Sequence, residues 1–356
     1  MRKFLYLILF FTCYIFFSCK KFSQSNNPIN IILLIGDGMG LPQITGGMYA
    51  NNNKTELENF KSIGLSKTHS NDDLVTDSAS AGTAFACGVK TNNGTIGIDF
   101  NGKKHPSILE ICQKLGYSTG LVVTSSITHA TPASFYAKVK SRNNHEEIAK
   151  QLSSKNINFF VGGGEKYFIS RKDERNLISE MQDYDFVNNI LEYKESTSNN
   201  IGFLTYDDQP PSLSEGRIPS LINLSKITID KLSSQSKPFF LMIEGSQIDW
   251  GSHDNDIDYF IEEFNEFDKT LKTVLDYAKN NENTLVVVTA DHETGGFHVL
   301  GGRLGNKNSY IKGGFLTTGH SADMVPVFSY GPYSENFSGI YDNTEIFKKL
   351  SDIIIK

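Results

Sequence analysis

Short apolar runs alternate with segments of helical spacing along most of the chain. The first run, Asn30–Ile35, is almost wholly apolar and ends at a glycine-rich turn, a pattern typical of a strand buried on both faces. Similar runs follow at Ser118–Thr124, Pro238–Ile243, Thr284–Thr289 and Val325–Ser329. Segments of helical spacing lie between them, at Pro106–Lys114, His145–Leu152, Pro219–Leu232 and Tyr259–Lys279. This alternation predicts an α/β fold, in which helices sandwich a large, mostly parallel β-sheet.

One segment departs from this pattern. Residues 165–215 have weaker periodicity and many Asn, Ser, Asp and Glu residues, so we expect a peripheral insertion there. The length of 356 residues allows one large domain or two, because typical domains have roughly 100–150 residues. No internal repeat or clean domain boundary is visible, and we expect residues 29–356 to form one domain.

The chain begins with the features of an export signal. Two basic residues precede an apolar run over residues 4–17, which is short for a membrane span of about 20 residues. The cysteine after this run is similar to that of bacterial lipoprotein signals. We therefore predict a signal peptide over residues 1–18, a lipid on Cys19 and a polar tether over residues 19–28. The protein would be held in the periplasm, on the inner or outer membrane; an ordinary cleaved signal and an uncleaved anchor are the alternatives.

Composition and charge exclude several classes of protein. Apolar residues make up 39% of the chain and charged residues 21%, which fits neither a disordered protein nor one with many membrane spans. The formal net charge of -6 argues against a nucleic-acid partner. Four cysteines are too few for a disulfide scaffold. Cys87 lies in a run of small residues typical of a buried helix, so we expect a packed free thiol there, and the pairing state of Cys112 is left open.

Polar residues follow the apolar runs. In an open parallel sheet, ligands bind outside the carboxyl ends of the strands, so these residues are the candidates for a site. They are Asp37 after the first run; His129, Thr131 and Arg142 after the second; Glu244, Asp249 and His253 after the third; and Asp291 and His292 after the fourth. Several carboxylates in one cleft require positive charge to offset them, and metal ions are the simplest source of it.

The spacing of these residues supports metal binding. Asp249 and His253 are four residues apart and face the same way on a helix, and Asp291 and His292 offer an oxygen and a nitrogen on one turn. Mixed histidine and carboxylate ligands suit zinc, whereas oxygen ligands alone suit magnesium. The oxygen-only candidates are Asp37, Glu244 and Thr131. Either pair by itself is more often found at a helix start or in a turn, with its side chains hydrogen-bonded to their neighbours. The occurrence of both pairs with the other candidates at successive strand ends is what favours metal binding.

Ser78 is the candidate nucleophile. It lies in the small-residue run VTDSASAGTA, residues 75–84, where we expect a tightly packed helix whose first turn begins at Ser78. Backbone amides and the helix dipole at such a position favour a negatively charged group, such as an alkoxide or a bound phosphate. A serine that only caps the helix is the alternative.

Five motifs point to a known family. They are GDGMG, VTDSASAGTA, EGSQIDWGSH, TADHETGG and GHSADMVPVFSYGP, in this order between residues 36 and 332. They resemble the motifs of the alkaline phosphatases. The resemblance implies that family's fold, with the site at the C-terminal ends of the strands. It also implies a zinc- and magnesium-dependent enzyme that hydrolyses phosphate monoesters to alcohol and inorganic phosphate, through a phosphoserine intermediate on Ser78.

The resemblance also assigns roles to single residues. It implies a first zinc ion on Asp249, His253 and His320, and a second on Asp37, Asp291 and His292. It implies a third ion, normally magnesium, on Asp37, Thr131 and Glu244. Arg142 would bind the phosphate, because its planar fork matches two phosphate oxygens. The residues expected next to these groups, without a role as ligand, are Asp77, His129 and Trp250.

The chain departs from the family in three respects, of which the change to Ser321-Ala322-Asp323 after His320 should have little consequence. His129 and Trp250 lie where members vary, some having aspartate and lysine, and a histidine at 129 weakens the expectation of an oxygen-only magnesium site. The short interval between His292 and His320 leaves little room for the crown through which longer relatives form dimers. A homodimer is therefore an open expectation.

Three kinds of function compete. The residues favour an exported phosphomonoesterase, whose activity should rise toward alkaline pH because alkoxide and hydroxide are its working species. Sulfatases need x-Pro-x-Arg after their nucleophile, which is absent after Ser78, and phosphodiesterases usually have threonine as nucleophile. A non-catalytic, metal-stabilised surface lipoprotein would need no nucleophile at all.

Overall fold

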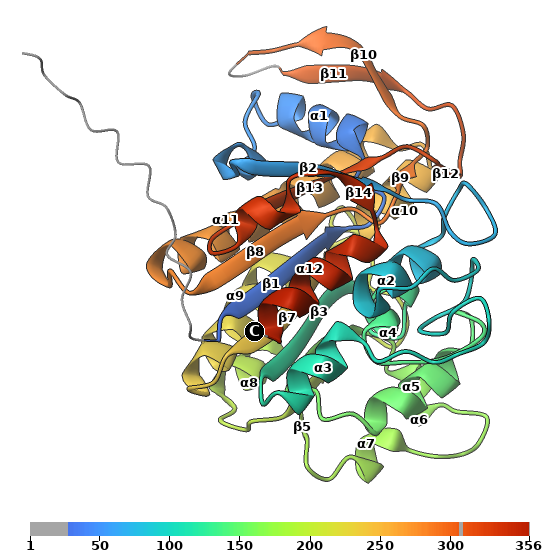
Figure 1. The fold of residues 1–356 in the computed structure, drawn as a ribbon, viewed down its shortest axis with the longest axis vertical. Helices are drawn as coiled ribbons and strands as arrows, with labels where there is room; N and C mark the ends of the chain where they lie inside the picture. Colours follow the sequence, from blue (N-terminus) through green and yellow to red (C-terminus); the bar gives the residue numbers. More distant parts are fainter. Residues whose placement is uncertain (1–27, 306–308, 356) are drawn as a thin grey trace, which may run out of the picture.

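A ten-stranded β-sheet runs through the centre of the structure, a computed structural model that describes residues 28–305 and 309–355 (Figure 1). In spatial order its strands are β14 (Gly339–Asp342), β2 (Ser62–Lys67), β13 (Val325–Tyr330), β8 (Thr284–Thr289), β1 (Asn30–Gly36), β7 (Phe239–Gly245), β3 (Ser118–Ser126), β4 (Phe159–Gly163), β6 (Ile201–Leu204) and β5 (Asp185–Phe186). The five predicted strands are all present. The predicted signal peptide, residues 1–18, and residues 19–27 of the predicted tether lie outside the described residues.

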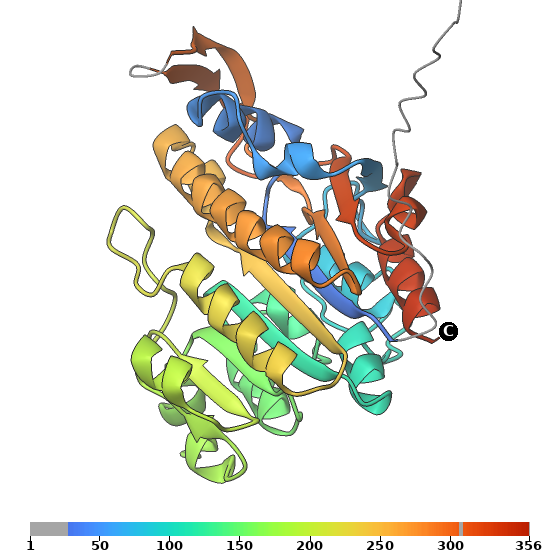
Figure 2. The ribbon, with the colours of Figure 1, turned by 90° about the vertical axis from the view of Figure 1, so that its left-hand side faces the viewer.

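Helices cover both faces of the sheet (Figure 2). One face carries α2 (Ser78–Cys87), α3 (Ile108–Lys114), α4 (Ala130–Ser134), α5 (His145–Ser153), α6 (Lys166–Ile169), α7 (Leu177–Glu180) and α12 (Thr344–Ile354). The other carries α1 (Leu41–Ala50), α8 (Ile190–Glu195), α9 (Leu221–Ser234), α10 (Gln247–His253) and α11 (Ile257–Asn280). Alternate residues of β1 face the two layers, Leu33 one and Leu34 the other. The predicted α/β sandwich is confirmed, and none of the described helices is long and apolar enough to cross a membrane.

β13 is antiparallel to both of its neighbours, β8 and β2, within a sheet that is mostly parallel, as predicted. Between β8 and β13 the described chain forms β9 (Glu293–Thr294), the hairpin of β10 (His298–Arg303) and β11 (Tyr310–Gly314), and β12 (His320–Ser321). These residues contain no described crossover helix. A strand parallel to β8 would need a crossover that carries the chain back to the other end of the sheet. A chain that stays at the end where β8 finishes re-enters the sheet in the opposite direction.

Residues 165–215 form the far edge of the sheet rather than a separate insertion. They contain α6, α7, β5, α8 and β6, and β6 pairs in parallel with both β4 and β5. The two strands are short, which is why the apolar pattern along this segment is weak. Ile201 and Phe203 of β6 nevertheless belong to the buried core.

The two cysteines of the described chain are free and buried. Cys87 lies on α2, as the small-residue run predicted, and burial raises the pKa of its thiol to about 11. Both thiols therefore pack as small apolar groups in the core, together with the rest of their cluster.

Candidate active site

The turn after β1 brings several strand ends together. β1 lies between β7 and β8 and is parallel to both, so their carboxyl ends meet at one edge of the sheet. Asp37 follows β1, and its amide donates to Gly245 O at the end of β7 (3.1 Å). Gly38 has a φ of +69°, and a Cβ there would lie 2.7 Å from Thr294 Oγ1 and 2.8 Å from Asp249 Cα. Only glycine allows a turn this close to its neighbours.

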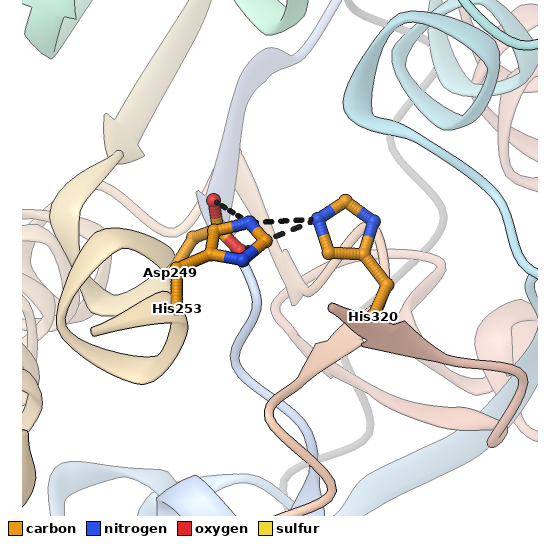
Figure 3. Close-up of side chains that lie close together, drawn as sticks. All are labelled: Asp249, His253 and His320. Carbon is orange, nitrogen blue, oxygen red and sulfur yellow. Dashed lines mark hydrogen bonds and ion pairs between the residues drawn. The ribbon is translucent and has the colours of Figure 1, made fainter. Parts of the chain in front are cut away.

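The first group of candidate ligands contains one carboxylate and two imidazoles (Figure 3). Asp249 and His253 lie one turn apart on α10, and His320 lies on β12. His253 Nε2 is 3.3 Å from Asp249 Oδ2 and 3.1 Å from His320 Nε2. The Nδ1 atoms face backbone carbonyls instead, that of Thr318 for His253 (2.5 Å) and that of Thr76 for His320 (2.8 Å). Because each Nδ1–H donates to a carbonyl, the neutral form of each imidazole has its lone pair on Nε2, as metal-binding histidines do.

The second group contains Asp37, Asp291 and His292, which are all buried. His292 Nε2 is 3.2 Å from Asp291 Oδ2 and 3.5 Å from Asp37 Oδ1. Asp291 Oδ1 accepts hydrogen bonds from the amides of Gly38 (3.1 Å) and His292 (3.0 Å), which turns Oδ2 toward the imidazole. Ser78 Oγ lies 3.4 Å from His292 Nε2, at the margin of this group.

The third group shares Asp37 and adds Glu244 and His129. Glu244 is the next-to-last residue of β7, and its Oε2 accepts a hydrogen bond from Ser246 Oγ (2.7 Å). Thr131, the predicted hydroxyl ligand, is buried in the first turn of α4. His129 precedes α4, where it brings a nitrogen atom to a set predicted to contain only oxygen ligands.

Several buried atoms of these groups have no hydrogen-bond partner among the described residues. They are both carboxylate oxygens of Asp37, Asp291 Oδ2, Glu244 Oε1, Thr131 Oγ1 and His129 Nδ1. Leaving a buried polar atom without a partner costs about 1–3 kcal/mol, and more when the group is charged. The carboxylate oxygens among these atoms lie close together and fit bound cations, because a metal ion satisfies several acceptors at once.

Burial, neighbouring charges and hydrogen bonds shift the pKa values of several candidate ligands. Burial raises the pKa of Asp37 well above its usual range, and the neighbouring carboxylates add to the effect. Burial also raises the pKa of Glu244 to about 7, despite the nearby hydroxyls that lower it. Burial lowers the pKa of His320 to about 4, whereas the hydrogen bond to Asp249 raises the pKa of His253 to about 9. A cation among these groups would favour ionised carboxylates and neutral imidazoles.

Asp77, rather than Ser78, caps the helix that carries the candidate nucleophile. The Oδ1 atom of Asp77 accepts a hydrogen bond from the amide of Ser80 (2.9 Å), and α2 begins at Ser78 as predicted. Ser78 is therefore not the capping serine of the alternative interpretation. Its hydroxyl lies at the positive end of a ten-residue helix, beside the second group of candidate ligands.

Arg142 lies beside the same helix end. Its Nη1 donates to Asp77 Oδ2 (2.9 Å), and its Nη2 donates to His129 Nε2 (3.3 Å). The side chain is 24% exposed. The ring of Trp250 meets that of His129 edge-on, with centroids 6.1 Å apart. The three residues predicted to lie next to the ligand groups are therefore all in contact with one another or with Arg142.

Thr294 is a site residue that the sequence analysis missed. Its Oγ1 donates to Asp249 Oδ1 (2.5 Å) and lies 3.2 Å from His292 Nδ1. Its place two residues after His292, within the motif TADHETGG, was the available signal. The carbonyls of Thr76 and Thr318 were missed as well, and no property of their side chains could have revealed a backbone contact.

Comparison with known proteins decides the family. Residues 29–313 match the family model for alkaline phosphatase. The chain belongs to the alkaline phosphatase family. It is 34% identical to alkaline phosphatase 4 of Bacillus subtilis, over 90% of this chain and 88% of that protein.

Solved alkaline phosphatases have the same fold. The enzyme from the Antarctic bacterium TAB5 matches with a TM-score of 0.86 and 43% identity, over 92% of this chain and 98% of that chain. A variant of the TAB5 enzyme, in which a glutamate replaces a histidine and magnesium is bound in the M3 site, matches with a TM-score of 0.86 and 42% identity over 92% and 98% of the two chains. The family, fold class and enzyme class predicted from the motifs are confirmed, and this alkaline phosphatase is a phosphoric monoester hydrolase.

Proposed function

We propose that this alkaline phosphatase hydrolyses phosphate monoesters through a covalent phosphoserine on Ser78. The observation that carries the proposal is the position of Ser78 Oγ, at the start of α2 and 3.4 Å from His292 Nε2. In the first step the Ser78 hydroxyl gives up its proton, Ser78 Oγ forms a bond to phosphorus, and the bond from phosphorus to the ester oxygen breaks, so that the alcohol leaves with a proton. Water then attacks the phosphorus, the bond to Ser78 Oγ breaks, a proton from the water returns to Ser78 Oγ, and inorganic phosphate leaves.

The ligand groups fit two zinc ions. The ligands would be Asp249, His253 and His320 for the first ion, and Asp37, Asp291 and His292 for the second. Mixed imidazole and carboxylate ligands suit zinc. When bound, the ions supply Lewis acidity, which favours the alkoxide form of a serine and offsets charge on phosphate oxygens.

A third metal ion would be held by Asp37, Glu244 and Thr131. Oxygen ligands of this kind suit magnesium. His129 belongs to the same group, and its nitrogen makes zinc a competitor for the site. The TAB5 variant with magnesium in its M3 site has a glutamate in place of a histidine, which supports the inference that an imidazole in such a site influences which ion binds.

Arg142 and the first turn of α2 would bind the phosphate. The guanidinium fork can donate to two phosphate oxygens at once, and the free amides at the helix start favour the same negative charge. Asp77 holds Arg142 through Nη1 and caps the helix through its other oxygen. This carboxylate therefore positions the clamp relative to the nucleophile without binding the phosphate itself.

Initial rates on a nitrophenyl phosphate monoester and on the matching diester test the proposed activity. We expect kcat/KM for the monoester to exceed that for the diester by at least about a hundredfold, because the diester offers fewer charged oxygens to the cationic site. The monoester rate should rise toward alkaline pH, since the attacking species is an alkoxide. A preference for the diester, or a rate that is highest in acid, would contradict the proposal.

Export and anchoring are proposed from the N-terminal residues. The basic start, the short apolar run and Cys19 support a periplasmic lipoprotein on the inner or outer membrane. A homodimer is a separate proposal, which light scattering tests. Cys19→Ala should move the phosphatase from the membrane fraction to the soluble fraction, because the lipid is lost. Cys13→Ala, within the predicted signal peptide, is the matched control and should stay with the membrane. Membrane association that survives in a Cys19→Ala chain from which residues 1–18 have been cleaved would rule out the lipid anchor.

A further inference from the structure

The hydroxyl of Thr294 lies between the two candidate zinc groups. Thr294 is fully buried on β9, and its Oγ1 is 2.5 Å from Asp249 Oδ1 and 3.2 Å from His292 Nδ1. Asp249 belongs to the first group and His292 to the second. One side chain that is not itself a candidate ligand thus contacts a ligand of each group.

The direction of the two hydrogen bonds follows from the atoms. An ionised carboxylate only accepts, so the single proton of the Thr294 hydroxyl points to Asp249 Oδ1. The lone pairs of Oγ1 are then left for His292, which must donate through Nδ1–H. A neutral imidazole that carries its proton on Nδ1 has its lone pair on Nε2. This lone pair faces Asp37 Oδ1 and Asp291 Oδ2, 3.5 and 3.2 Å away.

The position of the Thr294 hydroxyl is fixed by a glutamine side chain, by strand pairing and by the space beside a glycine. Gln43 Nε2 donates to the carbonyl of Thr294 (2.7 Å) and to Glu293 Oε1 (2.9 Å). In the pairing of β9 with β12, Thr294 lies opposite His320, a third candidate ligand. Gly38 leaves the space that the hydroxyl occupies, because a Cβ at that position would be 2.7 Å from Oγ1.

We propose that Thr294 is a positioning residue that links the two zinc sites. Its hydroxyl selects the His292 tautomer that can bind metal through Nε2, and it orients Asp249 so that Oδ2 remains directed at His253. The chain of hydrogen bonds runs from His292 Nδ1–H to Thr294 Oγ1, and from the Thr294 hydroxyl to Asp249 Oδ1. The inference rests on the proposed two-zinc function and adds a residue that couples the two ions.

Zinc affinity measures this role directly. Zinc is titrated into the metal-free enzyme against a chromogenic chelator, and the visible spectrum of the cobalt(II)-loaded enzyme reports the ligand geometry. Thr294→Val keeps the shape of the side chain but removes the hydroxyl, and we expect zinc affinity to fall by about 10–100-fold with a changed cobalt spectrum. Thr294→Ser keeps the hydroxyl and should retain affinity within about threefold of the wild type.

A matched control separates this role from packing. Thr289→Val removes another buried hydroxyl, which donates to Pro326 O (3.0 Å), and it should leave zinc affinity unchanged. If Thr294→Val does not fold, the Ser and Ala variants at this position make the same comparison. If Thr294→Val binds two zinc ions with wild-type affinity, this inference is wrong but the two-zinc function stands. The same conclusion follows if Thr294→Ser loses as much zinc affinity as Thr294→Val. Failure of the wild type to bind zinc would overturn the two-zinc function as well.

Discussion

Ser78→Ala is expected to lower kcat for phosphate monoesters by more than about a thousandfold, because the oxygen that attacks phosphorus is lost. Water attacking the bound ester directly would account for the remaining rate. Two measurements check the result: steady-state hydrolysis of a nitrophenyl phosphate, and acid quenching with a radiolabelled ester. The wild-type chain should retain label on Ser78, and the variant should retain none.

Ser80→Ala is the control for this experiment. Ser80 lies on the same helix and is also buried, but its hydroxyl donates to Thr91 O (3.0 Å), away from the candidate ligands. Its kcat should stay within about threefold of the wild type, as expected for a hydroxyl outside the chemistry. Ser78→Ala that keeps most of the wild-type rate would refute the covalent mechanism.

Removal of metal with a chelator is expected to abolish activity and to lower the melting temperature by about 10 °C. An ion present at a thousand times its Kd stabilises the folded state by about 4 kcal/mol per site, and two such sites account for a shift of this size. In the metal-free enzyme, Asp37, Asp291 and Glu244 remain buried with oxygens that lack partners among the described residues. Calorimetry before and after chelation checks the stability, and added zinc should restore both properties.

The inactive nucleophile variant provides the control for metal removal. Ser78→Ala keeps every candidate ligand, so chelation should lower its melting temperature by as much as that of the wild type. Elemental analysis of the purified enzyme should give about two zinc ions per chain, with a third equivalent that is magnesium or zinc. Full activity at a zinc content well below two per chain would contradict the two-zinc assignment.

Five of the ten strands of the sheet were predicted, because burial on both faces requires continuous apolar runs. β8 has the bounds read from its residues, and β1, β3 and β7 differ by no more than two residues at either end. Strand direction was not predictable in the same way. β13 is a short apolar strand like the parallel strands β1 and β8, but its direction depends on a connection that stays at one end of the sheet. The short strands β5 and β6 were missed because they are too short to establish a period.

The candidate site was predictable to the extent that its residues follow strands. Asp37, Glu244 and Asp291 come at the ends of three adjacent strands, and parallel pairing alone brings such positions together. His320 was assigned only by resemblance to the family, since it follows no predicted strand. It reaches the site because β12 pairs with β9.

Residue types and their spacing were sufficient for the α/β fold, the helix that begins at Ser78 and the family, because each depends on neighbours along the chain. The contacts of Thr294, the carbonyls that orient His253 and His320, and the ion pair of Arg142 with Asp77 join segments far apart in sequence. Their geometry follows from how the sheet and its connecting segments pack. A hydroxyl that directs one proton to a carboxylate and accepts another from an imidazole can be recognised only when all three groups are placed together.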